Sequence, residues 1–382
     1  MNIVYCIPHL YNAGGMERVL TQKANYLASL PEMHITIVTT EVTPAGKQVC
    51  YFPLDERVRV VELNIDFDAD FHAPLLRKFV NHRRKQKHYR QALVQVLSET
   101  QADVCISLCG KEIAFIGELD VPCRKLAEIH FAMTQREQLL MQYHKGLFWR
   151  LLGKIRTRQL QRAVRKVEKL VVLTKADEQQ WRKAGVTNTV CIPNPTPIMP
   201  DNSGKHDKKT VLAVGRLHPQ KGYDLLLRAW AQVAAKHPDW KLQIVGEGDE
   251  RQHLAALANE LGIAQTVQME GLSNDLTADY RSSGLFVLSS RYEGLPLALM
   301  EAMSCGCCCL AFDCPHGPRE LIVNEQNGVL LPAEDITALA QAIDHYINHP
   351  ELRKSLGEAA CAHAKAHFAL EPVMAQWLQI LR

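Results

Sequence analysis

Short runs of apolar, β-favouring residues alternate with longer helical patterns along the whole chain. This alternation constrains the fold most, because strands that return to a sheet in the same direction need helix-sized crossovers. The runs are NIVYCI (2–7), HITIVTT (34–40), DVCISL (103–108), KLAEIH (125–130), KLVVLT (169–174), TVCI (189–192), TVLAVG (210–215), KLQIVG (241–246), VQMEG (267–271), LFVLSS (285–290) and CCCLAF (307–312). The sequence therefore predicts an α/β chain with parallel, doubly wound sheets.

One stretch in the middle of the chain interrupts this pattern. PNPTPIMPDNSGKHDKK (193–209) is rich in Pro, Asn, Asp and Lys and has no apolar periodicity, which is typical of a linker. The chain has 382 residues, and two domains of about 190 residues fit the usual domain size. We expect two Rossmann-like domains, 1–195 and 196–366.

Composition indicates a globular protein of the cytoplasm. The chain is 47% hydrophobic and 22% charged, it contains no apolar run of about 18 residues, and its start lacks the features of a secretory signal. Its twelve cysteines are then expected to be reduced thiols. The cluster Cys305, Cys307, Cys308 and Cys309 has no second ligand pair, so buried packing is favoured over a metal site.

Two segments of the first half are strongly basic, although the formal net charge is only +3. Residues 77–90 hold seven Lys or Arg and no acid, and residues 145–169 hold nine against one acid, Glu168. The second segment also carries Leu147, Phe148, Trp149, Leu151, Leu152 and Ile155. Such a mixture could dock on an anionic membrane surface, or its apolar stripe could pack on its own domain. Nucleic-acid binding is disfavoured because no recognition motif accompanies the charge.

The segment SSRYEGLPLALMEAMSCG (289–306) places two carboxylates around a helix start at the end of a strand. Gly294 and Pro296 break the chain, so Glu293 belongs to the loop and Glu301 to the helix, about 7.5 Å further along its axis. Ligands of open α/β sheets bind outside the carboxyl ends of the strands, where this loop must lie. The carboxylates could bind different parts of one extended ligand, or they could be solvated charges.

The strand-to-helix segment AVGRLHPQKGYDLLLRAW (213–230) presents Arg216 and Lys221 close together. Two cations near a helix start suit a diphosphate, although the segment alone could equally be a solvated basic loop. The following strand ends in IVGEG, where Gly246 and Gly248 would let the backbone approach a ligand. A third glycine is missing, and the absence of the dinucleotide fingerprint argues against a nicotinamide enzyme.

The first half offers fewer candidates. Gly14 and Gly15 lie between the first strand and a helix, where they could pass under a phosphate or form a simple tight turn. His130 ends a strand and could be a ligand contact or a structural histidine. No D-x-D-like pair offers a metal platform, so we expect positive side chains to balance a diphosphate.

Together these segments resemble the retaining glycosyltransferases of family 4, which have the GT-B fold. The resemblance is carried by Gly14 and Gly15, His130, GRLHPQKG (215–222), IVGEG (244–248) and EGLPLALME (293–301) followed by AMSCG. The order of the segments matches over nearly the whole chain. The later FDCPHGPRELI (312–322) and NGVLL (327–331) resemble members that build bacterial polysaccharide, glycan or lipopolysaccharide chains.

The resemblance implies two domains facing a cleft, and a donor sugar on a nucleoside diphosphate, most often UDP. Glu301 would hold the ribose and Glu293 the donor sugar, while Arg216 and Lys221 would stabilise the leaving diphosphate. Gly15 would let its loop close over the phosphate, and His130 would contact the sugar near the reacting carbon. The implied catalytic set is His130, Glu293, Arg216 and Lys221. The implied donor-binding set is Gly15, Arg216, Lys221, Gly246, Glu293, Gly294, Leu295 and Glu301.

The resemblance also implies a metal-independent hexosyltransferase that retains the anomeric configuration by same-face attack, although a protein nucleophile stays open. Related chains often end in a helix that crosses back onto the first domain, and residues 367–382 could form it. We expect a glycan, a polyprenyl-diphosphate-linked glycan or a lipopolysaccharide core as acceptor, at the cytoplasmic face of the inner membrane.

Two other classes remain in view. A hydrolytic or epimerising enzyme of similar fold stays open. A non-catalytic sugar-nucleotide-binding or scaffold subunit would be expected to lose Glu293, Arg216 or Lys221, and the chain has all three.

Overall fold

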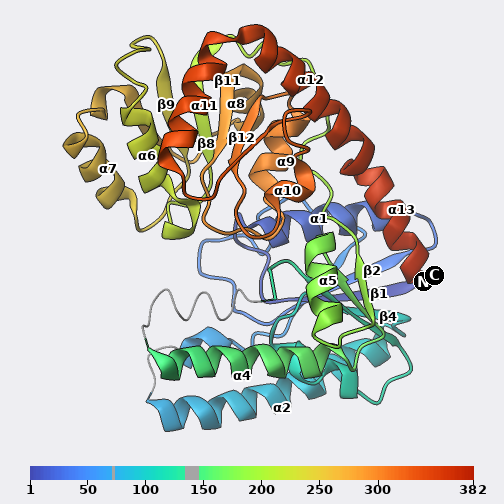
Figure 1. Ribbon diagram of the computed structural model, residues 1–382. Helices are drawn as coiled ribbons and strands as arrows, with labels where there is room; N and C mark the ends of the chain where they lie inside the picture. The colour runs from blue at the N-terminus through green and yellow to red at the C-terminus, as the bar shows by residue number, and fades with distance from the viewer. Residues whose placement is uncertain (71–73, 134–145) are drawn as a thin grey trace. The chain divides into compact units, whose positions relative to one another are not determined.

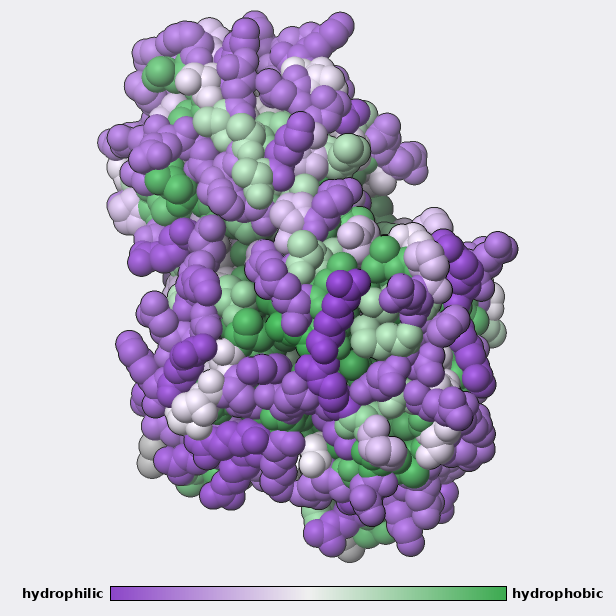
Figure 2. Space-filling model, turned by 90° about the vertical axis from the view of Figure 1, so that its right-hand side faces the viewer, coloured by the Kyte–Doolittle hydropathy of each residue, from purple (hydrophilic) through white to green (hydrophobic). Residues whose placement is uncertain are grey.

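The computed structural model describes residues 1–70, 74–133 and 146–382, which form two compact units. The first unit comprises Met1–Pro193 and Gln376–Arg382, and the second comprises Asn194–Ala375. The described surface shown in Figure 2 is mostly hydrophilic, and its hydrophobic residues gather in separate patches. No helix in the described ranges is both long and apolar enough to cross a membrane.

The first unit is built on a parallel sheet with the strand order β3-β2-β1-β4-β5-β6-β7. Its neighbouring strands β2, β1 and β4 are labelled in Figure 1. Its strands are β1 (Asn2–Ile7), β2 (His34–Thr39), β3 (Arg59–Glu62), β4 (Val104–Ser107), β5 (Arg124–Ile129), β6 (Lys169–Val172) and β7 (Thr189–Cys191). In the register, Ile3 of β1 pairs with Ile35 of β2 and with Val104 of β4. The central strands are almost wholly buried, as expected for a sheet that is covered on both faces.

Helices and short 3₁₀ turns of the first unit connect these strands. They are α1 (Gly15–Ala28), η1 (Phe67–Asp70), α2 (Leu75–Glu99), η2 (Lys111–Ala114), η3 (Ile116–Glu118), α4 (Leu147–Val164) and α5 (Lys175–Lys183). Tyr89 and Leu93 of α2 and Val164 of α4 are fully buried in the core. The C-terminal halves of these two long helices therefore anchor them to the unit.

The second unit is built on another parallel sheet, with the order β10-β9-β8-β11-β12-β13. Its strands are β8 (Lys208–Val214), β9 (Lys241–Val245), β10 (Val267–Gly271), β11 (Ser283–Leu288), β12 (Cys309–Phe312) and β13 (Val329–Leu331). Phe286 of β11 pairs with Leu212 of β8 and with Cys309 of β12. Both units are thus doubly wound, and the predicted fold class is confirmed.

The helices and 3₁₀ turns of the second unit include η4 (Pro219–Lys221), α6 (Tyr223–Ala231), α7 (Arg251–Glu260), η5 (Ala264–Thr266), α8 (Leu276–Ser282), α9 (Leu297–Ser304), α10 (Pro318–Leu321), α11 (Ile336–Asn348) and α12 (Pro350–His367). Two of these helices, α8 and α11, begin at an aspartate that caps them. Asp275 accepts a hydrogen bond from the backbone N of Ala278 at the start of α8, and Asp335 does the same for Ala338 in α11. These side chains satisfy backbone donors that have no partner inside the helix.

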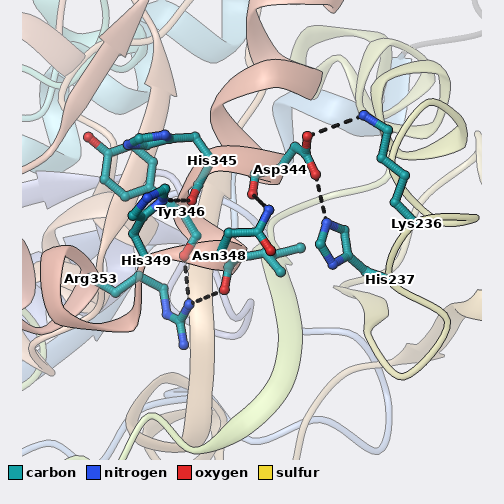
Figure 3. A network of polar contacts seen from close by, with 9 residues as sticks. Lys236, His237, Asp344, His345, Tyr346, Asn348, His349 and Arg353 are labelled. Atoms are coloured by element: carbon teal, nitrogen blue, oxygen red, sulfur yellow. Dashed lines mark hydrogen bonds and ion pairs between the residues drawn. The ribbon is translucent and has the colours of Figure 1, made fainter.

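A polar network ties α11 to its neighbours in the second unit (Figure 3). His237 Nε2 lies 2.7 Å from Asp344 Oδ1, and Lys236 lies 3.2 Å from Asp344 Oδ2. Contacts with His237 and Lys236 lower the pKa of Asp344. Arg353 of α12 donates to the carbonyl oxygens of Tyr346 and Ile347, at 2.6 and 2.8 Å. The guanidinium therefore caps carbonyls in the last turn of α11.

The chain's last helix, α13 (Leu370–Leu381), begins in the second unit and ends in the first. Trp377 is buried, and Arg124 of β5 donates to the carbonyl oxygens of Ile380 and Leu381 at 2.8 and 2.6 Å. Arg124 also forms a two-pronged ion pair with Glu168. Charge-assisted hydrogen bonds thus fasten the C-terminal residues to the amino end of strand β5.

The predicted strands all exist, within a few residues at their ends. Strand β3 was not predicted, since only four residues form it and none of them is fully buried. The stretch 193–209 does not behave as a free connector. Strand β8 begins inside it at Lys208, Thr196 is buried, and the backbone N of Thr196 donates to the carbonyl of Phe368. The two units divide at the start of this stretch, between Pro193 and Asn194, and the polar groups of the rest of it find partners in the second unit.

Candidate active site

The strand order of the second sheet reverses at β8, whose neighbours are β9 on one side and β11 on the other. The loops that leave the carboxyl ends of β8 and β11 therefore start side by side, at the point where open α/β sheets bind ligands. Lys221 lies at the end of η4, which follows β8, and Glu293 lies in the loop between β11 and α9. The sheet topology thus brings together two predicted residues that are 72 positions apart.

Lys221 and Glu293 form an ion pair, with 2.7 Å between Nζ and Oε1. Ser290 also donates its hydroxyl to Glu293 Oε1, at 2.6 Å. The Lys221 side chain is 19% exposed and that of Glu293 is 7% exposed. The carboxylate is fixed by two donors while the ammonium retains access to solvent, so a ligand could reach this cation.

A second set of contacts braces the two loops against each other. The backbone N of Arg291 donates to Gln220 O at 2.8 Å, and the Gln220 amide donates to Tyr292 O at 2.9 Å. Arg291 also forms a bidentate pair with Asp224 of α6, at 2.8 and 2.7 Å. Burial would raise the pKa of Asp224, but Arg291 lowers it. These contacts fix the positions of Lys221 and Glu293 relative to each other.

Glycines allow the strand-end loops to approach one another at the backbone. A Cβ on Gly222 would lie 2.1 Å from Ser289 O, and one on Gly246 would lie 2.0 Å from Gly215 O. Gly222 has φ +62°, and Gly246 has φ +149°. Both positions thus combine a conformation that favours glycine with a contact too close for any side chain. The glycines expected to approach a ligand are used in part for loop packing.

Arg216 is exposed on the loop after β8. Burial and the nearby charge of Arg216 lower the pKa of His218, which places the guanidinium near that ring. His218 Nδ1 accepts a hydrogen bond from the backbone N of Gln220 and so shapes the turn that leads to Lys221. Arg216 is therefore available to a ligand on the same loop as Lys221.

Glu301 lies on α9 and is buried. Tyr280 donates its hydroxyl to Glu301 Oε2 at 2.9 Å, and burial together with this carboxylate raises the pKa of Tyr280. Leu295 is also buried, and Gly294 O lies close to Gly317. Glu301 thus belongs to the same loop-helix segment as Glu293 but is held by a different partner.

The cysteines near this segment are buried. Cys307, Cys308 and Cys309 are almost inaccessible, as the packing interpretation expects. Burial, together with nearby Glu293, raises the pKa of Cys314 to about 12. Cys314 is therefore neutral at pH 7 and is a poor nucleophile. The described residues contain no group of three His, Cys, Asp or Glu side chains that could hold a metal ion.

The predicted first-domain residues lie in the first unit. Gly14 is the N-cap of α1 and Gly15 its first residue. The buried Glu17 carboxylate lies where a Cβ on Gly14 would be, and its Oε1 is 3.0 Å from His9 Nδ1. The glycine loop is thus packed beside a carboxylate, an arrangement that the sequence interpretation did not include.

His130 directly follows β5 and is largely buried. Its Nε2 lies 3.0 Å from Glu128 Oε1, and Glu128 Oε2 accepts a hydrogen bond of 2.6 Å from Lys23 Nζ. The Lys23 ammonium lies 3.6 Å from the centre of the Trp377 ring. His130 is thus one end of a row of contacts that continues through Glu128 and Lys23 to Trp377.

Sequence reasoning missed several residues that hold the candidate residues in place. They are Ser290, Arg291, Gln220, Asp224, Lys23 and Glu128. Glu128 and His130 are two positions apart at a strand end, and this period of two was a usable signal that they share a side. The contacts of Arg291 and Lys23 depend on the folded chain and had no local signal.

Known proteins are similar to this chain over all of its length or much of it. Residues 196–363 match the family described as Glycosyl transferases group 1. An uncharacterised glycosyltransferase of Haemophilus influenzae is 29% identical, over 99% of each chain. A Campylobacter jejuni enzyme is 26% identical over 100% of this chain and 98% of its own. Its name is GalNAc-alpha-(1->4)-GalNAc-alpha-(1->3)-diNAcBac-PP-undecaprenol alpha-1,4-N-acetyl-D-galactosaminyltransferase.

Among solved structures, that of the S. aureus TarM G117R mutant, in complex with fondaparinux, alpha-GlcNAc-glycerol and UDP, has a TM-score of 0.80. It covers 100% of this chain and 99% of its own, at 16% identity. This likeness shows a GT-B type of fold. Together, the family match and the named relatives support glycosyltransferase activity for this chain.

The contact between Gly222 and Ser289 generates a stability prediction with a matched control. Gly222→Ala and Gly262→Ala introduce the same side chain at similar backbone angles, φ +62° and φ +70°. A Cβ on Gly262 meets nothing within 4 Å. Gly262→Ala should therefore lower the free energy of unfolding by only about 1–2 kcal/mol, the cost of placing an alanine in the left-handed conformation. Gly222→Ala should cost more than about 3 kcal/mol, because backbone must also move.

The free energy of unfolding, measured by urea denaturation of both variants, checks this difference. Equal losses in the two variants would contradict the close packing of the β8 and β11 loops.

Proposed function

We propose that this chain is a retaining glycosyltransferase of the family 4 type. It transfers a hexosyl unit from a nucleoside-diphosphate sugar, with a UDP-sugar as the first candidate, to a glycan or a polyprenyl-diphosphate-linked glycan. The biosynthesis of bacterial surface polysaccharide or lipopolysaccharide would be its setting. The observation that carries the proposal is the Lys221–Glu293 pair at the reversal point of the second sheet.

Two comparisons support the finer terms of this proposal. The name of the Campylobacter jejuni relative describes transfer of an N-acetylgalactosaminyl unit to an undecaprenol-diphosphate-linked glycan. The similar TarM structure contains UDP. A lipid-linked glycan acceptor and a UDP donor are therefore the first candidates for this chain.

In the proposed reaction, the bond between the donor anomeric carbon and the diphosphate oxygen breaks, and the acceptor hydroxyl oxygen bonds to that carbon from the same face. The acceptor proton passes to the departing phosphate oxygen. Negative charge grows on the diphosphate as the bond breaks, so cations placed there lower the barrier. Lys221 and Arg216 would supply this charge without a metal cofactor.

Glu293 would bind hydroxyls of the donor sugar, and Glu301 those of the ribose. Carboxylates accept hydrogen bonds from hydroxyl pairs, and the two residues belong to one loop-helix segment. The backbone at Gly246, Gly294 and Leu295 would complete the donor contacts of the second unit. Gly15 and His130 of the first unit keep their proposed roles toward the phosphate and the sugar.

Lys221 changes partners in this scheme. In the free protein its ammonium is held by Glu293, and a bound diphosphate would draw it away while sugar hydroxyls replace it at the carboxylate. Each group exchanges one polar partner for another, so neither charge is left buried and unpaired when the pair separates. The pair would thus keep both groups oriented before the donor binds.

Sugar donors provide the direct test of the proposed activity. UDP-glucose, UDP-galactose, UDP-N-acetylglucosamine, UDP-N-acetylgalactosamine and GDP-mannose would be incubated with the protein without acceptor, and released nucleotide measured over hours. We expect slow hydrolysis of one or two UDP-sugars. Binding of a nucleotide sugar without any turnover, also in the presence of lipid-linked glycans, would favour a non-catalytic subunit instead.

Substitutions at the ion pair should separate catalysis from folding. Lys221→Met should lower sugar transfer by about 100-fold or more, the loss seen when one stabiliser of developing charge is removed. Glu293→Gln should lower it by about tenfold or more, because hydrogen bonds to a charged acceptor are stronger than those to an amide. Glu293→Gln keeps an acceptor for Ser290 and Lys221, so the fold should persist.

Lys236→Met is the matched control, since this lysine pairs with Asp344 at the surface and lies outside the proposed site (Figure 3). It should leave transfer within about twofold of wild type, because exposed ion pairs contribute little. Wild-type turnover in both site variants, with circular dichroism unchanged, would refute the assignment.

We also propose that the first unit docks on the anionic cytoplasmic face of the inner membrane through the N-terminal halves of α2 and α4. Phe79 and Leu151 are 57% and 55% exposed, and Val80 and Ile155 are also exposed. Lys145 and the side chains of Leu147 and Phe148 lie outside the described residues. Of the other residues predicted to form the apolar stripe, Trp149 and Leu152 are half-buried, whereas Leu151 and Ile155 are exposed.

The charge of these two helices fits anionic lipid. Their exposed cations are Arg77, Lys78, Arg83, Arg84, Lys87, Arg150, Lys154, Arg156 and Arg158. Glu118 of η3 pairs with Arg90 of α2 and with Lys166 just after α4, which places both helices beside one turn. Each cation near such a surface contributes about 1 kcal/mol, and inserted apolar side chains add to this.

Vesicle co-sedimentation tests the docking. The wild-type protein should sediment with phosphatidylglycerol vesicles at low salt and dissociate from them at high salt. It should not bind phosphatidylcholine vesicles. The double variant Phe79→Ser, Leu151→Ser should have an affinity for these vesicles about tenfold lower than that of the wild type. Leu272→Ser changes a leucine that is 61% exposed in the second unit, so it should have no effect. No binding of the wild type at low salt would overturn the proposal.

A further inference from the structure

We propose that Glu128 is a positioning residue for His130, and that Lys23, whose ammonium lies over the Trp377 ring, holds the other carboxylate oxygen of Glu128. The proposal rests on the proposed function, in which His130 contacts the donor sugar. It adds that the histidine depends on a buried row of side chains, and that the row ends on the chain's C-terminal helix.

The contact between Glu128 and His130 decides which ring nitrogen carries a proton. Nε2 lies 3.0 Å from Glu128 Oε1, and both side chains are nearly inaccessible. An unprotonated Nε2 would point its lone pair at a carboxylate oxygen in a site with little water, which is repulsive. A proton on Nε2 makes this ion-pair contact attractive. Glu128 thus favours the tautomer of His130 that carries its proton on Nε2.

Lys23 keeps Glu128 in its charged form. Its Nζ donates to Glu128 Oε2 at 2.6 Å, and the side chains are 1% and 2% exposed. Burial would raise the pKa of Glu128, but Lys23 and His130 outweigh it and hold this pKa at about 2. The carboxylate therefore stays ionised at any physiological pH, and its two oxygens serve two different partners.

Trp377 closes the other end of the row. The Lys23 ammonium lies 3.6 Å from the centre of the Trp377 ring and 5.7 Å from the centre of the Tyr5 ring. A cation over an indole face is attracted more strongly when water is excluded. Trp377 belongs to Gln376–Arg382, which is part of the first unit and is anchored there by Arg124. The end of the chain thus contributes to the setting of His130.

Stability alone is a weak reason for such a row. A buried ion pair adds little net stability, and an apolar pair of similar volume is often as stable. The row instead places a charge of fixed geometry against a histidine that directly follows a strand. Outer partners of this kind orient functional histidines and set their tautomer.

A double-mutant design separates positioning from folding. Lys23→Met with Glu128→Leu removes both charges at nearly constant volume, so the first unit should fold. This variant should lower kcat for the UDP-sugar that the donor panel identifies by about 10-fold or more, with KM nearly unchanged. In a His130→Asn background the same two substitutions should have almost no further effect.

Lys23→Met with Glu128→Gln is the matched conservative variant, because the amide oxygen can still accept from Nε2. It should recover most of the lost kcat. The Trp377→Leu variant, which keeps Lys23 and Glu128, should have a kcat between those of the Lys23→Met, Glu128→Gln variant and the Lys23→Met, Glu128→Leu variant. A further loss of activity in the His130→Asn background as large as the loss in the wild-type background would overturn the proposal and leave the proposed function standing.

A readout that does not need activity completes the test. In protein labelled with ¹⁵N-histidine, with the His130→Asn variant used for assignment, His130 should carry its proton on Nε2. The Lys23→Met, Glu128→Leu variant should show a mixture of tautomers. An unchanged His130 signal in that variant would refute the positioning role. Absence of turnover in the wild type with every sugar tested, beside a changed signal, would refute the proposed function alone.

Discussion

The reversal of strand order at β8 is the constraint on which the candidate site depends. Parallel strands present all their carboxyl ends at one edge, and only at this point do the crossovers lead to opposite sides. The loops of β8 and β11 can then meet, and Gly222 and Gly246 let the strand-end loops meet at backbone distance. The Lys221–Glu293 contact follows from this arrangement of chain, since the two residues lie on different loops.

Much of the fold could be predicted because the central strands are buried on both faces and read as continuous apolar runs. The prediction was weakest where burial is shallow. Strand β3 (Arg59–Glu62) lies at the sheet edge and has no fully buried residue, so it left no such run. The stretch 193–209, predicted as a linker, begins where the two units divide, between Pro193 and Asn194. Its composition is polar, yet Thr196 and Asn194 are buried in the folded unit, and composition does not predict that burial.

The site was predictable to the extent that strand ends identify it. Lys221, Glu293 and Glu301 could be expected near one edge because each follows a recognisable strand. Their supports could not, because Arg291 reaches Asp224 across 67 positions and Lys23 reaches Glu128 across 105. Contacts of that separation depend on the register between elements, which apolar periodicity leaves open.

The Lys221–Glu293 and Lys23–Glu128 pairs differ in exposure, and this difference argues for different roles. Lys221 is 19% exposed and Glu293 is held by a serine as well, so the lysine can exchange its partner for a ligand while the carboxylate keeps its place. The side chains of Lys23 and Glu128 are only 1% and 2% exposed, and the Lys23 ammonium lies 3.6 Å from the centre of the Trp377 ring. A ligand therefore cannot replace either partner. A charge that cannot leave its partner is useful only for what it holds in position. In the first unit the residue held in position is His130. The buried pair adds little net stability, and its role is to set the tautomer of this histidine before any substrate binds.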